Sequence, residues 1–290
     1  MREVLAASRP FSWVNTAYPY AAGYLMATGG RVDVALVVGT LYFLGPYNLL
    51  MYGINDVFDY ESDLRNPRKG GIEGALADPA TARVVHRRIL LACVVTNVPF
   101  LVWLLALGGT AADVTLALVV FGVVAYSAPR LRFKERPVLD SLTSAMHFVG
   151  PLLYALVLTG TDLTARTAWP VLVAFVAWGM ASHAFGAVQD VRADREGGLA
   201  SVATVLGAHT TVVAATVAYV LGAAALLALP GPGVLAAVLP LPYAVNTARF
   251  WSVRDADCER AHDGWRVFLW LNLVTGFLVT MLLIAHARLG

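Results

Sequence analysis

The 290-residue sequence has little charge. Asp, Glu, Lys and Arg together make up 14% of it, whereas 58% is hydrophobic and the mean hydropathy is +0.67. A water-soluble domain carries about 25% charged residues, so this composition excludes an ordinary soluble globular protein. Cysteine is also scarce, and Cys93 in an apolar run and Cys258 in a polar segment give no basis for a disulfide framework. The N-terminal segment has no short cleavable apolar region, and we expect no signal peptide.

Long apolar runs are what the sequence has in abundance. A transmembrane helix needs about 20 residues at about 1.5 Å each, and nine runs approach that length. They cover residues 12–28, 34–54, 88–107, 113–128, 138–158, 168–188, 210–229, 232–248 and 265–286. We therefore expect an all-α integral membrane protein with nine transmembrane helices, forming a single domain over residues 1–290.

Positive charge is distributed unevenly around these runs. If the N-terminus is cytosolic, all but three of the 21 Lys and Arg residues fall on the cytosolic side, the exceptions being Arg31, Arg166 and Arg288. This bias follows the positive-inside rule and predicts a cytosolic N-terminus and an external C-terminus. Most of the 19 carboxylates fall on the same side, which that rule does not require. A face that carries both signs is typical of a binding site.

The first acidic motif is the segment NDVFDYESD at residues 55–63, directly after an apolar run. If the helix continues through it, Asp56, Asp59 and Asp63 are spaced i, i+3 and i+7 and share one helical face. Their mutual repulsion would be relieved by Mg²⁺, which prefers carboxylate oxygens and substrate phosphates. The alternative is a solvated acidic helix end that repeats at helical spacing by chance.

A second acidic motif follows the sixth run, in the segment HAFGAVQDVRADREGG at 183–198, where Asp190 and Asp194 are spaced i and i+4. Cations accompany both motifs and fill the intervening loop YSAPRLRFKERP at 126–137. They are Arg65, Arg68 and Lys69 after the first motif, Arg192 and Arg195 within the second, and Arg130, Arg132, Lys134 and Arg136 in the loop. Carboxylates for a metal together with Arg and Lys for phosphate oxygens indicate a site for a diphosphate bridged by Mg²⁺.

These motifs together resemble the UbiA superfamily of intramembrane prenyltransferases. The resemblance rests on N-D-x-x-D-x-x-x-D at 55–63, D-x-x-x-D at 190–194 and the loop that begins Y-S-x-P at 126, and it covers nearly the whole chain. It implies nine helices around a central cavity and Mg²⁺ as cofactor. It assigns catalysis and metal binding to Asp56, Asp59, Asp63, Asp190 and Asp194, with Asn55 as a further metal ligand. It implies diphosphate contacts from Arg68, Lys69, Arg132 and Lys134, to which their positions add Arg65, Arg195 and Tyr126.

Three longer stretches, at 8–25, 45–76 and 182–198, are similar to the lycopene elongases of actinobacteria and haloarchaea. This similarity implies dimethylallyl diphosphate as donor and lycopene, or its C45 intermediate, as acceptor, with C50 carotenoids as final products. The expected chemistry is ionisation of the allylic diphosphate, attack by a terminal double bond, and loss of a proton or capture of water. Tyr126, Tyr154, Phe148 and Trp178 are candidates for sheltering the cation, with plain packing as the alternative for each.

Two other functions stay open. One is the same transfer to an aromatic or quinol acceptor. The other is divalent-cation transport, which predicts carboxylates near the membrane midplane rather than at one surface. We favour the prenyltransferase, located in a bacterial or archaeal cell membrane with its active site on the cytosolic side.

Several other polar residues have both a structural and a functional interpretation. His147 and His183 lie inside predicted spans, where we expect buried hydrogen bonds, with proton shuttling as the alternative. Asp140 either orients a cation of the basic loop or caps the fifth helix. The carboxylates at residues 255–263 alternate with arginines, which indicates a solvated loop.

Overall fold

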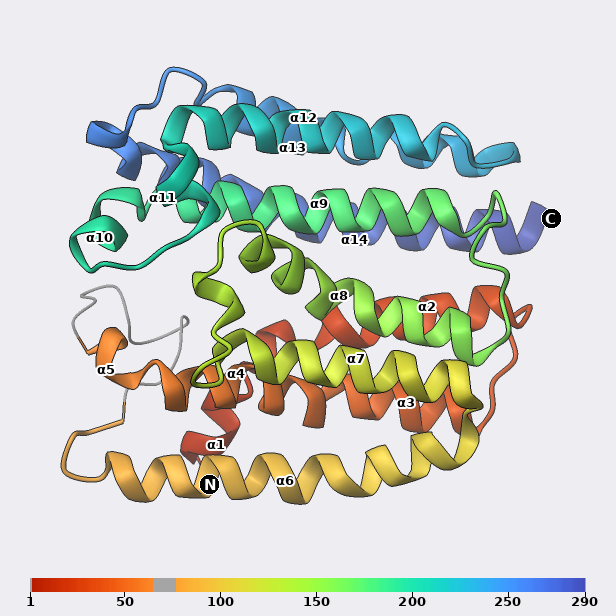
Figure 1. The fold of residues 1–290 in the computed structure, drawn as a ribbon. Coiled ribbons are helices and arrows are strands. Elements are labelled where there is room, and N and C mark those ends of the chain that lie inside the picture. Colours follow the sequence, from red (N-terminus) through yellow and green to blue (C-terminus); the bar gives the residue numbers. More distant parts are fainter. Residues whose placement is uncertain (1, 65–76, 290) are drawn as a thin grey trace. The chain divides into compact units, whose positions relative to one another are not determined.

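The computed structural model describes residues 2–64 and 77–289, except the side chains of Ser62, Asp63 and residues 287–289, and every regular element in this part of the chain is a helix (Figure 1). The chain forms two compact units. The first unit comprises residues 1–132 and 150–161, and the second comprises 133–149 and 162–290. Each unit therefore carries one of the two acidic motifs.

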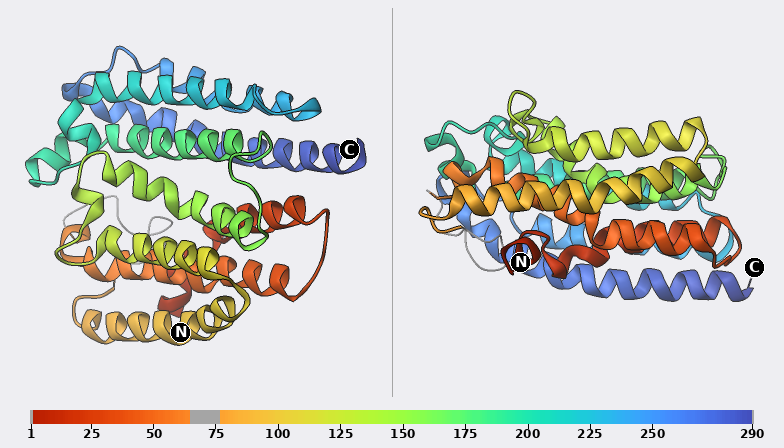
Figure 2. Two further views of the ribbon diagram at one scale, coloured as in Figure 1. Left: turned by 45° about the vertical axis from the view of Figure 1, so that its right-hand side comes forward. Right: turned by 90° about the horizontal axis from the view of Figure 1, so that it is seen from below.

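The helices of the first unit follow one another along the chain. They are α1 (Arg2–Ala7), η1 (Pro10–Ser12), α2 (Trp13–Ala27), α3 (Val34–Leu44), α4 (Pro46–Phe58), α5 (Tyr60–Asp63), α6 (Ala82–Leu107), α7 (Thr110–Ser127) and the second half of α8 (Leu139–Leu158). Within this unit α2 packs on α3, and α4 packs against both α6 and α7 (Figure 2). The packing thus places the end of α4, where the first motif lies, beside the ends of α6 and α7.

The core of the first unit is rich in aromatic rings. Tyr20, Phe43 and Tyr47 are fully buried, with ring centroids 5.2 Å apart between Tyr20 and Phe43 and 5.1 Å apart between Phe43 and Tyr47. Tyr154 of α8 packs on the same cluster, 6.1 Å from Tyr20. Of the candidates for sheltering a cation, Tyr154 therefore lies in the packed interior of this unit.

Buried amides connect the helices of the first unit. Asn48 Nδ2 of α4 donates to Thr16 Oγ1 of α2 at 2.6 Å and to the Phe43 carbonyl at 2.8 Å. Asn97 Nδ2 of α6 donates to the Pro46 carbonyl at 2.8 Å. Polar side chains inside an apolar bundle are stable when they are hydrogen-bonded across helices. Asn48 thus joins α4 to α2, and Asn97 joins α6 to the start of α4.

The second unit holds the remaining elements. They are η3 (Phe133–Glu135), the first half of α8, α9 (Trp169–Val188), α10 (Val191–Glu196), α11 (Val202–Leu206), α12 (Ala208–Leu226), η4 (Gly231–Val238), α13 (Leu241–Ala248), η5 (Asp255–Arg260) and α14 (Ala261–Leu289). Here α9 and α12 pack along much of their length, and the hydroxyls of Ser182 and Tyr219 lie 3.0 Å apart between them. Asn246 Nδ2 of α13 donates to the Gly264 carbonyl of α14 at 2.9 Å.

The expected nine transmembrane helices are not confirmed. Seven helical segments in the described part of the chain are long and apolar enough to cross a membrane: Val34–Phe58, Ala82–Leu107, Thr110–Ser127, Leu139–Leu158, Trp169–Val188, Ala208–Leu226 and Asp255–His286. The run at 12–28 forms α2, which has only 15 residues. The run at 232–248 divides into η4 and the eight-residue α13, because Pro240 and Pro242 lack the amide hydrogen that would continue a helix.

The prediction of one unbroken helical face through residue 63 is also wrong. Helix α4 ends at Phe58, Asp59 is its C-cap, and α5 begins at Tyr60. Carboxylates at the C-terminal end of a helix oppose its dipole and repel one another, which favours a break there. Asp59 still follows Asp56 at helical spacing, because its N–H donates to the Asn55 carbonyl at 2.9 Å.

Candidate metal and diphosphate site

The first acidic motif places two carboxylates where little water reaches them. Asp56 lies in the last turn of α4 and Asp59 is the C-cap, and Asp59 is only 4% exposed. Asn55, between the apolar part of α4 and these carboxylates, accepts a hydrogen bond through Oδ1 from Ser127 Oγ at 2.7 Å. Ser127 is the last residue of α7, so the Y-S-x-P segment and the acidic motif are in direct contact. A buried carboxylate is stable only with hydrogen bonds or a counter-charge.

Two arginines supply counter-charge to this motif. Arg9 Nη2 lies 2.9 Å from Asp56 Oδ1, and its guanidinium stacks over the Tyr52 ring at 4.4 Å. Arg132 Nη2 lies 3.6 Å from Asp59 Oδ1. The structure thus places Arg132 beside Asp59 of the first acidic motif. The sequence analysis did not assign Arg9 to the site. Its one visible feature there is that it is a cation placed directly before the first long apolar run.

The backbone of the basic loop is strained where its arginines stand. Arg130 has φ 72° and Arg132 has φ 38°, in the left-handed region that costs a non-glycine residue about 1 kcal/mol or more. The Arg132 N–H nonetheless donates to the Ala128 carbonyl at 3.0 Å, which closes the turn after α7. Tyr126 lies in the last turn of α7 and is half-buried. Lys134, in η3, is half-buried and belongs to the second unit.

The second acidic motif lies at the junction of α9 and α10. Asp190 occupies the N-cap position of α10, and Asp194 lies inside that helix, with its N–H donating to the Asp190 carbonyl at 2.8 Å. Both side chains are half-buried. Gln189, before the motif, is held by its own contacts: Nε2 donates to the Gly186 carbonyl at 2.9 Å, and Oε1 lies 2.8 Å from His262 Nδ1. These contacts give Gln189 a structural role at the end of α9.

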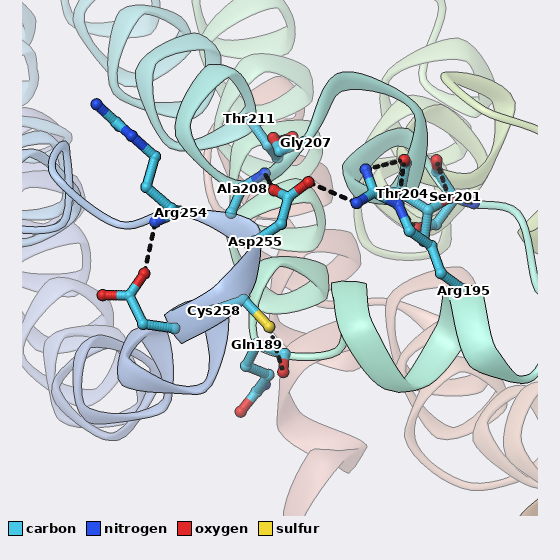
Figure 3. A network of polar contacts seen from close by, with 11 residues as sticks. Gln189, Arg195, Ser201, Thr204, Gly207, Ala208, Thr211, Arg254, Asp255 and Cys258 are labelled. Carbon is cyan, nitrogen blue, oxygen red and sulfur yellow. Dashed lines mark hydrogen bonds and ion pairs between the residues drawn. The ribbon is translucent and has the colours of Figure 1, made fainter.

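The arginines of α10 bind carboxylates of η5, and Figure 3 shows the pair of Arg195 and Asp255. Arg195 Nη1 lies 2.5 Å from Asp255 Oδ2, and Arg192 forms an ion pair with Glu259. Asp257 bonds within its own segment, accepting from Arg260 Nη1 at 2.8 Å. The prediction that residues 255–263 form a solvated loop is confirmed in part: the Asp255 and Glu259 side chains are 43% and 51% exposed, but the segment is helical, and these two carboxylates pair with the arginines of α10.

Two further predictions about polar residues can be compared with the structure. Asp140 is fully buried in the first turn of α8 and accepts from the N–H of Ser141 at 2.6 Å and from that of Val202, the first residue of α11, at 2.7 Å. It therefore bonds amides at the start of two helices and is not the N-cap of the fifth helix. His183 Nδ1 lies 3.1 Å from Ser141 Oγ, which is the buried hydrogen bond expected for it. His147 is buried in α8.

Some predicted site residues lie beyond this description. Arg65, Arg68 and Lys69 fall outside the described residues, and the carboxylate of Asp63 is not described. Within the described part of the chain, no three His, Cys, Asp or Glu side chains form a ready-made metal cage. Mg²⁺ usually takes one or two protein carboxylates, with water and substrate phosphates completing its shell. The buried Asp56 and Asp59, with the Asn55 amide beside them, fit that donor set.

Comparison with known proteins adds independent information. A model of the UbiA prenyltransferase family matches residues 16–274. The lycopene elongase/hydratase of Corynebacterium glutamicum is 49% identical over 285 residues, which cover 98% of this chain and 97% of that protein. The C(50) beta-cyclic carotenoids biosynthesis protein LbtBC of Dietzia sp. is 54% identical over 278 residues, which cover 96% of this chain and 63% of that longer protein.

Solved structures share the fold. A UbiA homolog from Archaeoglobus fulgidus bound to DMAPP and Mg²⁺ matches with a TM-score of 0.70, over 94% of this chain and 98% of that one, at 19% identity. The apo structure of a UbiA homolog from Aeropyrum pernix K1 matches with a TM-score of 0.67 over 94% of this chain and 98% of that one, at 16% identity. The expected all-helical prenyltransferase fold is thereby confirmed.

Proposed function

The chain belongs to the UbiA prenyltransferase family, and we propose that it transfers dimethylallyl groups from dimethylallyl diphosphate to the ends of lycopene, giving C45 and C50 carotenoids. The observation that carries this proposal is similarity over 98% of the chain to a protein named lycopene elongase/hydratase. The structure of the site also supports the proposal, because it holds two buried carboxylates, Asp56 and Asp59. An arginine lies beside each of them.

We assign metal binding to the residues of the two acidic motifs. They are Asn55, Asp56, Asp59, Asp63, Asp190 and Asp194. When bound, Mg²⁺ supplies positive charge that stabilises the leaving diphosphate. This assignment is supported by the oxygen-rich donor set and by the burial of Asp56 and Asp59, which keeps competing water away from the carboxylates.

Diphosphate binding is assigned to the basic residues around those motifs. They are Arg65, Arg68, Lys69, Arg132 and Lys134, with Tyr126 as a hydroxyl donor. Arg195 is set apart from them, because its guanidinium bonds to the Thr204 carbonyl and to Asp255. Arg132 is the best supported of these, because its guanidinium already lies at Asp59 and arginine binds phosphate oxygens through two parallel N–H groups.

The proposed reaction conserves atoms and charge. The C–O bond of the allylic diphosphate breaks, and its electron pair leaves with the diphosphate. A terminal double bond of lycopene then supplies the electrons of the new C–C bond, which leaves a tertiary cation on the acceptor. That cation loses a proton to form an alkene or captures water to form an alcohol. Aromatic faces stabilise such cations, and Tyr126, Tyr154, Phe148 and Trp178 are the candidates.

The proposed enzyme is a multi-pass protein of a bacterial or archaeal cell membrane, with its N-terminus and active site on the cytosolic side. The seven long apolar segments among the described residues support the membrane assignment. The distribution of Lys and Arg supports the orientation. Lycopene partitions into the bilayer, whereas dimethylallyl diphosphate is charged and water-soluble, so a site at the membrane surface gives both substrates access.

Expression in lycopene-producing bacterial cells tests the proposal. We expect pigments heavier than lycopene by one or two five-carbon units, and an added oxygen where the cation captures water. Asp59→Ala should abolish the product, because it removes a buried metal ligand. The matched control is Asp162→Ala, which removes an exposed carboxylate bonded only to Thr164 among the residues described, and should keep wild-type yield.

Other outcomes of this test would reject the proposal. Unchanged lycopene, together with labelled product from 4-hydroxybenzoate and dimethylallyl diphosphate in isolated membranes, would assign an aromatic acceptor instead. Normal pigment yield from Asp59→Ala would reject the role given to the first acidic motif. Divalent-cation uptake without any prenylated product would indicate a transporter.

A further inference from the structure

The second acidic motif lies on a helix that is too short to be stable by itself. Helix α10 has only six residues, and Asp194 is one of them. A helix this short is unstable in isolation because its nucleation cost is not repaid. After α10 the chain turns through Gly197 and Gly198, the latter with φ 69°, and the N–H groups of Gly197 and Leu199 donate back to Ala193 and Asp194 at 2.9 and 2.8 Å. These bonds close the end of α10 but do not join it to a neighbouring helix. The direction of the Asp194 carboxylate therefore depends on what binds α10.

Arg195 binds α10 to its neighbours through three N–H groups. Its Nε and Nη2 donate to the Thr204 carbonyl at 3.0 and 2.6 Å, and its Nη1 donates to Asp255 Oδ2 at 2.5 Å (Figure 3). An ion pair whose partners are both 43% exposed contributes little to stability by itself. The planar fork of arginine nevertheless fixes direction, because three bonds to two different acceptors leave it one orientation.

Asp255 is itself held by the start of a long helix. Its second oxygen, Oδ1, accepts from the N–H of Ala208, the first residue of α12, at 2.7 Å. Gly207 is the N-cap of α12 and has no side chain to cap it, so Asp255 supplies the negative charge that a helix N-terminus favours. The approach is close, since a Cβ at Gly207 would lie 3.2 Å from Asp255 Oδ1. Asp255 thus connects α10 to α12, because it bonds Arg195 of the one and the first N–H of the other.

Thr204, the other acceptor of Arg195, is equally well fixed. It lies in α11, where Ser201 and Thr204 form a capping box: Ser201 N–H donates to Thr204 Oγ1 at 2.8 Å, and Thr204 N–H donates to Ser201 Oγ at 3.2 Å. The N–H of Val202 in the same helix donates to the buried Asp140 at 2.7 Å. Arg195 therefore reaches two anchored groups, one in α11 and one in η5.

We propose that Arg195 and Asp255 are positioning residues of the second acidic motif. Asp255 fixes Arg195 against the N-terminus of α12, Arg195 fixes α10, and α10 aims Asp194 at the Mg²⁺–diphosphate. This inference rests on the proposed function, in which Asp194 binds the metal. It gives Arg195 a role through Asp194, in place of the direct phosphate contact that its position in the sequence indicates.

The test is binding of labelled dimethylallyl diphosphate to the purified full-length protein in detergent, titrated with Mg²⁺. Loss of a group that orients a metal ligand typically weakens metal affinity about tenfold or more. We expect Asp255→Ala to raise the Mg²⁺ concentration for half-saturation by about tenfold. Asp255→Asn should cause a smaller rise, because its amide oxygen still accepts from Ala208. The matched control, Asp257→Ala, removes a carboxylate that bonds to Arg254 N–H and Arg260, and should bind as wild type.

The direct-contact alternative makes the opposite prediction. If Arg195 binds the diphosphate itself, removing Asp255 releases its guanidinium and leaves binding unchanged or tighter, whereas Arg195→Ala alone weakens it. Unchanged or tighter binding by Asp255→Ala would therefore overturn the positioning role. If Asp255→Ala does not fold, as judged by its thermal unfolding midpoint, Asp255→Asn decides between the two roles. A higher Mg²⁺ concentration for half-saturation supports positioning, and an unchanged or lower one supports direct contact. Absence of Mg²⁺-dependent binding in the wild type would overturn the proposed function, and this inference with it.

Discussion

The ion pair between Arg9 and Asp56 should be a strong local contribution to stability. The two groups lie 2.9 Å apart, and their side chains are 19% and 8% exposed. Two unit charges at that distance attract by about 6 kcal/mol at an effective dielectric constant of about 20. Desolvation of both groups offsets much of this attraction. We expect a net coupling free energy of about 2 kcal/mol, within the range measured for contacting residues.

A double-mutant cycle measures this coupling. The variants are Arg9→Met, Asp56→Asn and the double mutant, and the observable is the free energy of unfolding of the purified protein in detergent without ligand. Arg9→Met alone should cost about 3 kcal/mol, because it leaves a buried carboxylate without its arginine. In the double mutant much of that loss should be recovered.

The matched control is the pair Arg260 and Asp257, whose N–O distance is 2.8 Å and whose side chains are 62% and 39% exposed. The same cycle there should give a coupling below about 0.5 kcal/mol. Equal couplings for the two pairs would refute the reasoning, because burial would then have no effect on the strength of an ion pair at nearly equal distance.

Two further predictions concern other parts of the molecule. Gly264→Ala should destabilise the protein by about 1–3 kcal/mol, since the new Cβ would lie 2.5 Å from a Phe250 ring carbon. Gly276→Ala in the same helix has no described neighbour within 4 Å and should be neutral or stabilising. Thermal unfolding of both variants tests this, and equal losses of stability would contradict it. The Leu36 N–H and the Tyr24 hydroxyl lower the pKa of Asp33 below its ordinary value of 3.8, so the stability from this cap should be present above that value and be lost as the pH falls through the lowered pKa. Asp33→Asn should flatten the acid limb of unfolding midpoint against pH, and an unchanged limb would count against the cap.

The class of protein could be predicted from the sequence because it depends on composition and local spacing. Apolar runs of bilayer length require helices, since every backbone group in a membrane must be hydrogen-bonded within its own segment. The acidic motifs were visible because carboxylates at helical spacing follow two apolar runs directly in a chain with little charge. Prolines marked the segment around 240 as irregular, but the division into η4 and a short α13 needed the backbone itself.

Only the tertiary structure decided which charges meet. Arg9 and Asp56 are separated by 46 intervening residues, and Arg195 and Asp255 by 59, so no helical or strand period could pair them. The composition of 255–263 predicted solvated charges, and the side chains of Asp255 and Glu259 are indeed about half exposed, but only the structure showed that they pair with the arginines of α10. The amino-acid sequence by itself determined that most of the chain is apolar enough to form long helices, and it predicted which oxygen-rich segments could bind a metal, because both follow from residue type and local period. The counter-charge for each of these segments comes from residues that are distant in the sequence, and only the packing of the helices brings them together.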